Sequence, residues 1–109
     1  MRGMASFVHP DLEDVPLGAM LSALADPARR AIVRRLACDA EQDGEGLACS
    51  AAAPPDLPKA TMSNHYAVLR AAGLVQARKV GVSVLHTLRR DEVERRFPGV
   101  LGAVLAVRE

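Results

Sequence analysis

The hydrophobic pattern of the chain changes its period at Gly73, and this change limits the fold more than any other feature. Over residues 59–72 the apolar side chains recur at the three- and four-residue spacing of an amphipathic helix. Gly73 stands where a helix can end in the left-handed conformation that glycine adopts most easily. Beyond it, side chains alternate over 74–79 and again over 84–88, with Gly81 between the two runs. The sequence therefore predicts a helix that leads directly into a β-hairpin.

Further helices are expected on both sides of this unit. Asp26 is a typical N-cap ahead of Pro27, and the pair Pro54 and Pro55 must end any helix before it. Residues 1–14 have no sustained periodicity and are expected to form a flexible arm before one domain of residues 15–109. The expected helices cover about residues 17–24, 27–38, 47–53, 91–97 and 100–108.

The order of these elements is that of a winged helix-turn-helix. A short helix, a tight turn and a second helix rich in small polar residues form the helix-turn-helix, and the basic hairpin forms the wing. The predicted fold class is α+β and mostly α, with five to six helices and one β-hairpin wing.

Charge is distributed unevenly along the chain. Residues 1–56 carry five arginines against nine acids, a net charge of −4. Residues 57–90 carry six basic residues and no acid, and the rest of the chain is close to neutral. An anionic partner is the simplest explanation, and chance clustering on a solvated face is the alternative.

Composition excludes several other partners. With Phe7, Tyr66 and Phe97 as the only aromatic residues, the chain lacks a platform for stacking single-stranded bases. Its stretches without charge are about half as long as the roughly 20 residues of a membrane helix. The N-terminus lacks the apolar run of an export signal, and two cysteines are too few for a disulfide scaffold. We therefore expect a cytoplasmic protein without a membrane partner.

The helix over 59–72 can be divided into two faces at about 100° per residue. Met62, His65, Tyr66 and Leu69 fall on the inward face, where His65 is expected to be a packed, hydrogen-bonded residue rather than a ligand. Asparagine pairs bidentately with adenine in the major groove, and serine or threonine can contact bases or phosphates. The alternative is that the hydroxyls only cap the helix. The predicted DNA-contacting residues of this helix are Lys59, Ala60, Thr61, Ser63 and Asn64.

Four more residues are candidates for DNA contact. Arg78, Lys79 and Ser83 belong to the hairpin, whose slim tip can approach a phosphate backbone or a minor groove, unless it is an ordinary solvated hairpin. Arg70 lies at the side of the preceding helix, where a phosphate contact and an internal ion pair are both open.

Three stretches of the chain resemble the ArsR/SmtB family of bacterial transcriptional regulators, and the resemblance spans about residues 17–107. They are residues 24–33 (LADPARRAIV), 59–75 (KATMSNHYAVLRAAGLV) and 90–101 (RDEVERRFPGVL). The resemblance implies a homodimeric repressor that binds an inverted repeat in its own operator and leaves it when an effector is sensed. It also assigns DNA contacts to Thr61, Ser63 and Asn64, although Asn64 replaces a histidine usual in the family, so the base preference cannot be transferred.

The first and last helices are expected to form the dimer interface. Their stripes are more apolar than a core of this size requires, although both could be used internally. The predicted interface residues are Leu17, Met20, Leu21, Leu24, Leu101, Val104 and Leu105, with Val100 beside them.

Metal sensing is not expected. Metal-sensing members of the resembled family carry a Cys-x-Cys pair on the third helix or His and carboxylate ligands on the last one, and this chain offers only Cys49 and Glu109 there. Cys38 and Cys49 flank an acidic loop and could form a redox pair, but packing is the preferred role for both. No cofactor is predicted, and the effector is unknown.

The sequence is less typical of an enzyme or a protein-binding adaptor than of a DNA-binding regulator. An enzyme is disfavoured because Ser50, Ser63, His65 and His86 fit no nucleophile motif. A winged-helix adaptor that binds protein instead of DNA has no need for an acid-free segment. A dimeric DNA-binding repressor is therefore the predicted function, with the adaptor and a thiol redox-sensing repressor as alternatives.

Overall fold

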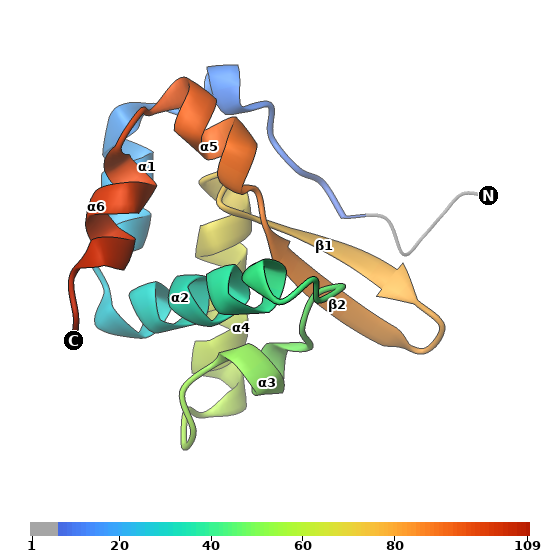
Figure 1. The fold of residues 1–109 in the computed structure, drawn as a ribbon. Helices are drawn as coiled ribbons and strands as arrows, with labels where there is room; N and C mark the ends of the chain where they lie inside the picture. Colours follow the sequence, from blue (N-terminus) through green and yellow to red (C-terminus); the bar gives the residue numbers. More distant parts are fainter. Residues whose placement is uncertain (1–6) are drawn as a thin grey trace.

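The structure is a computed structural model that describes residues 7–109, and it has the predicted winged helix-turn-helix architecture (Figure 1). Helices form one body and the two-stranded hairpin projects from it as the wing. Within the described residues, no helix has the length and apolar character needed to cross a bilayer. The elements are η1 (Leu12–Asp14), α1 (Leu17–Leu24), α2 (Pro27–Glu41), α3 (Cys49–Ala52), α4 (Lys59–Ala71), β1 (Val75–Val80), β2 (Ser83–Leu88), α5 (Arg90–Arg96) and α6 (Val100–Ala106).

Helix α2 begins where the sequence predicts and ends later. The Asp26 carboxylate accepts hydrogen bonds from the backbone N–H groups of Ala28, at 2.7 Å, and Arg29, at 3.3 Å. The predicted end near Cys38 is wrong by one turn, because Asp39 continues the helix and also organises the turn after it. Its backbone oxygen accepts from Gly44 N–H at 2.8 Å and its carboxylate from Gly46 N–H at 3.0 Å.

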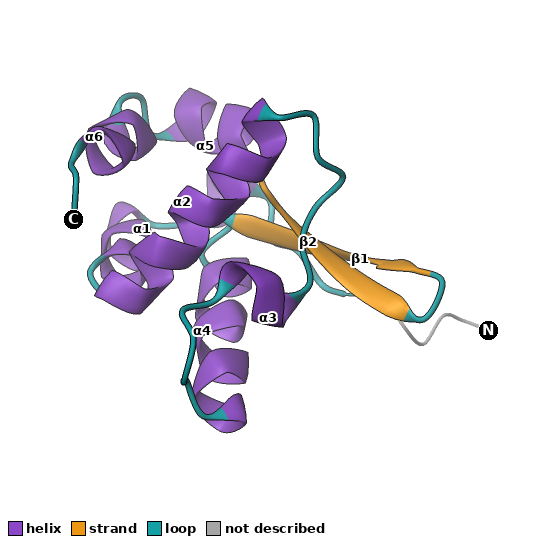
Figure 2. Ribbon diagram, turned by 60° about the horizontal axis from the view of Figure 1, so that its bottom comes forward, coloured by secondary structure: helices purple, strands orange, loops and turns teal. Residues whose placement is uncertain are grey.

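Helix α3 is shorter than the predicted 47–53, because Leu47 is paired with the wing. Leu47 and His86 form an isolated antiparallel bridge, with N–H to O distances of 3.0 and 2.8 Å. The chain entering the helix-turn-helix is therefore fixed to β2. Figure 2 shows α3 lying across α4 with the wing on the far side of the body from α6.

The switch from helix to hairpin occurs at Gly73 as predicted. Gly73 has φ +80, a left-handed conformation, and a Cβ there would lie 3.1 Å from the Leu12 side chain. The two strands pair antiparallel from Val75 opposite Leu88 to Val80 opposite Ser83. Gly81, with φ +62, and Val82 make the two-residue turn.

The segment predicted as a flexible arm over 1–14 contacts the rest of the domain from His9 onward, and residues 1–6 lie outside the described residues. The His9 Nε2 atom accepts a hydrogen bond from the Ala77 N–H of β1 at 3.0 Å. Arg89 donates to the Pro10 carbonyl at 2.8 Å, and Leu12 is buried in the core. The segment lacks periodicity because single contacts hold it, rather than an apolar face.

Candidate nucleic-acid interface

Helix α4 divides into the two faces that its sequence predicts. His65, Tyr66 and Leu69 are buried and Met62 is half-buried. The opposite side of its N-terminal half is exposed to solvent, and we call it the reading face. It consists of Lys59, Ala60, Thr61, Ser63 and Asn64.

The N-terminus of α4 carries no side-chain cap. Its N-cap residue is Pro58, which makes no capping hydrogen bond through its side chain. Among the described residues, no hydrogen bond joins the Thr61 or Ser63 hydroxyl to the first turn of the helix. The alternative that these hydroxyls serve as caps therefore finds no support, and the free N–H groups at this end are suited to a phosphate oxygen.

The inward face of α4 fixes the helix to α3 and to the wing. The Tyr66 hydroxyl donates to the Cys49 carbonyl at 3.0 Å, and the Tyr66 and His86 ring centroids lie 4.5 Å apart. Burial raises the pKa of the Tyr66 hydroxyl and lowers the pKa of His86, so both groups stay neutral. The reading face is therefore held at a defined angle to the wing.

His65 is the second fixed point of α4, and its packed position agrees with the expected structural role. Arg29 approaches the His65 Nδ1 atom at 3.3 Å. Because a guanidinium only donates, Nδ1 accepts and the ring proton is on Nε2. Arg29 also donates to the Ala23 and Ser22 carbonyls, so it connects the end of α1 to α4.

The wing residues differ in how free they are. Arg78, Lys79 and Ser83 are all exposed. The Arg78 guanidinium donates to the Glu45 carbonyl at 2.6 Å, which ties it to the loop between α2 and α3. Lys79 is the less constrained cation of the pair.

The six basic residues of the acid-free segment 57–90 are not all free to bind an anion. Arg89 is 8% exposed, pairs with Glu92 at 3.0 Å and is bound to the Pro10 carbonyl. Arg90 pairs with Glu41 at 3.2 Å. The Arg70 guanidinium carbon lies 5.7 Å from the centroid of the Phe7 ring, a cation–π contact. A phosphate contact of Arg70 stays a prediction.

The chain is similar to known helix-turn-helix proteins over most of its length. A helix-turn-helix domain family matches residues 24–76, which contain α2, α3 and α4. The chain is also 34% identical over 98 residues to the uncharacterized HTH-type transcriptional regulator YceK of Bacillus subtilis (strain 168), covering 88% of this chain and 94% of the relative.

The chain belongs to the HTH-type transcriptional regulators. It is therefore a DNA-binding regulator of transcription, a family that is generally not enzymatic. Within residues 24–76, the part that the family matches, α4 has an exposed polar surface.

The residues predicted for the dimer interface differ in their exposure. Met20, Leu24 and Leu101 are 0%, 5% and 1% exposed and belong to the protomer core, so their side chains are not available to a partner. Hydrophobic periodicity does not distinguish residues of the protomer core from residues of a dimer interface, because both kinds of apolar stripe have the same spacing. Leu17 and Leu21 are each 50% exposed on α1, and Val104 and Leu105 are half-buried on α6.

The two cysteines occupy different environments in the regulator. Cys38 is exposed on α2, whereas the Cys49 sulfur lies 3.9 Å from both ring nitrogens of His86. Burial raises the pKa of the Cys49 thiol, which disfavours the reactive thiolate. In residues 7–109, no three His, Cys, Asp or Glu side chains gather as metal ligands would.

Sequence reasoning missed the arginines as structural residues. Arg29, Arg30 and Arg34 on α2 all donate to backbone carbonyls at the ends of other helices. The only sequence feature that could have indicated this role is the clustering of arginines on α2. A solvent-exposed helix face has the same feature.

Proposed function

We propose that the protein is a dimeric, sequence-specific repressor of the ArsR/SmtB type that acts in the cytoplasm and binds an inverted-repeat operator upstream of its own gene. The single observation that carries the proposal is the reading face, where exposed polar side chains surround a helix N-terminus without a side-chain cap. An exposed face of this kind suits insertion into a major groove.

Each reading-face residue has a chemical role in this proposal. The Asn64 amide offers one donor and one acceptor, the pattern that matches adenine N7 and N6. Thr61 and Ser63 contact a base edge or a phosphate, and Lys59 neutralises a phosphate at the start of the helix. Lys79, Arg78 and Ser83 contact the flanking backbone from the wing, which leaves sequence readout to α4.

The dimer in this proposal forms through α1 and α6. Exposed apolar side chains occur on α1, at Leu17 and Leu21, and just after α6, at Val107. Burying them against a second copy removes apolar surface from water, and a two-fold axis there directs two reading faces to successive major grooves about 34 Å apart.

The test is operator binding measured by fluorescence anisotropy on the DNA upstream of the gene. We expect nanomolar affinity, strong weakening with added salt, and a preference over scrambled DNA of the same length. Equal binding to both DNAs would contradict sequence-specific reading. A protein that binds neither DNA and remains a dimer would favour the adaptor alternative.

The dimer is tested by light scattering on Leu21→Asp, with Val8→Asp as the control because Val8 is exposed at 90% and belongs to neither α1 nor α6. We expect monomers and much weaker operator binding for Leu21→Asp alone. A wild-type monomer that binds the inverted repeat tightly would refute the dimer.

A further inference from the structure

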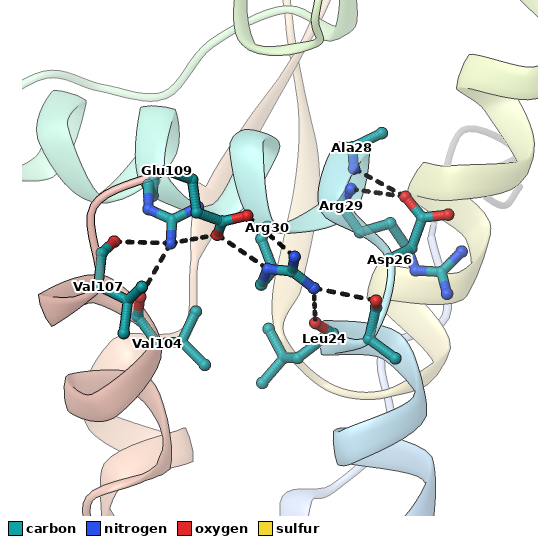
Figure 3. Close-up of polar contacts among 10 residues, drawn as sticks. Leu24, Asp26, Ala28, Arg29, Arg30, Val104, Val107 and Glu109 are labelled. Carbon is teal, nitrogen blue, oxygen red and sulfur yellow. Dashed lines mark hydrogen bonds and ion pairs between the residues drawn. The ribbon is translucent and has the colours of Figure 1, made fainter.

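Two arginines one turn apart on α2 hold a carboxylate, and we call Arg30 and Arg34 the arginine clamp. Arg30 binds both carboxylate oxygens of Glu109, with Nε to Oε2 and Nη2 to Oε1 distances of 2.9 Å. Arg34 donates from Nη2 to the same Oε2 atom. Figure 3 shows the Glu109 carboxylate facing the Arg30 guanidinium, with dashed lines for the contacts between them.

The arginine clamp is positioned independently of Glu109. Arg30 Nη1 donates to the Leu24 and Ala25 carbonyls at the end of α1, each at 2.9 Å. Arg34 Nη2 donates to the Val104 and Val107 carbonyls at the end of α6, each at 3.0 Å. Both guanidinium groups therefore keep their places if the carboxylate leaves, and a preorganised pair of donors is what an anion site requires.

Two hollows adjoin the arginine clamp, and most of the residues beside it there are apolar. One has a volume of about 430 Å³ and includes Pro27, Ala31 and Cys38, with Arg35 at its edge. The other, about 410 Å³, includes the side chains of Ala103, Val104 and Val107. Arg34 and Glu109 line both, so a ligand that displaces Glu109 would lie next to both spaces and beside the guanidinium donors.

We propose that the arginine clamp is a binding site for a small organic carboxylate with an apolar body, which takes the place of Glu109. The two donors of Arg30 fit the two oxygens of one carboxylate, and the hollows accept the apolar part. Inorganic phosphate shares the charge but has no apolar part for the hollows, so it is the weaker ligand. Glu109 is the internal competitor that keeps the site filled in the absence of this ligand.

Ligand binding at this site has a consequence that rests on the proposed function. Displacing Glu109 removes one of the contacts between α2 and the segment after α6, while α6 belongs to the proposed dimer face. A carboxylate ligand would then act on the regulator through its dimer, as an effector does. The binding itself needs neither the dimer nor DNA.

The experiment is isothermal titration of the protein without DNA, using benzoate, benzamide and inorganic phosphate as probes. Glu109→Gln removes the competing charge and leaves the carbonyl bonds of both arginines intact. If Glu109 occupies the clamp about 90% of the time, its removal should tighten benzoate binding about ten-fold relative to wild type. Glu13→Gln, an exposed glutamate in η1, is the matched control and should bind as wild type does.

The remaining probes distinguish the chemistry. Benzamide should bind neither protein, and phosphate should bind Glu109→Gln more weakly than benzoate does. Equal benzoate affinity in wild type and Glu109→Gln would overturn the proposal, as would no binding to either, and tighter binding of phosphate would show a plain anion site. Because no arm contains DNA, these outcomes are separate from any failure of the proposed function.

A second variant tests the geometry of the clamp. Arg30→Lys in the Glu109→Gln background keeps the charge and removes the two-pronged donor, so benzoate should bind about ten-fold more weakly. A thermal melt checks that this variant is folded. Unchanged benzoate affinity in a folded Arg30→Lys variant would also overturn the proposal.

Discussion

The basic residues on the reading face and the wing make different contacts from those in the rest of the molecule. Away from the reading face, arginines bind backbone carbonyls where helices and turns end. On the reading face and the wing, the exposed cations include Lys59 and Lys79, the two lysines of the chain. The arginines outside the wing that bind carbonyls at helix or loop ends are Arg29, Arg30, Arg34, Arg89 and Arg96, and Arg78 of the wing binds the Glu45 carbonyl.

The difference follows from the shapes of the two side chains. A guanidinium is a planar fork of donors that can bind two carbonyls or a carboxylate together. Arg96, for example, spans the Leu12 and Val15 carbonyls at 3.0 and 3.1 Å, and so closes η1 onto α5. Lysine is a flexible, strongly hydrated point charge that suits an exposed phosphate contact. Net charge in a segment therefore measures DNA-binding capacity only after the internal arginines are set aside.

The largest expected effect tests the internal arginines. Arg89→Met keeps the aliphatic stem but removes the bonds to Pro10 and Glu92, one of which holds the chain before η1. We expect the free energy of unfolding to fall by about 2–3 kcal/mol, measured by urea denaturation. Arg95→Met, at an exposed position of α5, is the control and should change it by less than about 0.5 kcal/mol. Similar losses in both variants would remove the distinction between the two sides.

Asn64→Ala tests the other side of the comparison. The substitution removes an exposed side chain that contacts nothing required for folding, so stability should be unchanged. Affinity for the preferred site should fall by about 1–3 kcal/mol, with discrimination lost at one base pair. Anisotropy on the preferred site and on single-base variants measures both. An unchanged affinity would mean that the register of the reading face on DNA is wrong.

Lys79→Ala should have a smaller and different effect. A phosphate contact carries no sequence information, so binding should weaken a few-fold on every DNA and the salt dependence should become shallower by about one unit of slope. Arg78→Ala is a less clean test, because its guanidinium is bonded to the Glu45 carbonyl. A loss confined to one DNA sequence would show that Lys79 reads bases.

Local signals predicted α4, the wing and the reading face. The 3.6-residue spacing, the stop at Gly73 and the alternation beyond it act within a few residues, and the exposed set from Lys59 to Asn64 follows from helix geometry. The misses involve contacts across the fold. The Leu47–His86 bridge, the His9 contact to Ala77 and the contact of the arginine clamp with Glu109 join residues that are tens of positions apart, and no local pattern marks them.

The smallest expected effect concerns the pH dependence of the contact between the arginine clamp and Glu109. Hydrogen bonds from Arg30 and then Arg34 lower the pKa of the Glu109 carboxylate from 4.5 to about 2. The folded state therefore binds this proton less tightly than the unfolded state, so the stabilisation is complete above about pH 4.5 and is lost as the pH falls through about 2. Glu109→Gln removes the titration, so its melting temperature should lie below that of wild type at about pH 7 and converge with it toward about pH 2.

The carboxylate is solvent-accessible, so about 0.5 M salt should reduce the difference at neutral pH. Thermal melts across this range, with Glu13→Gln as the control, measure it. A difference in melting temperature that stays constant with pH would show that the substitution acts through packing. The contact between the arginine clamp and Glu109 would then not depend on charge, and a competing anion would have no reason to replace it.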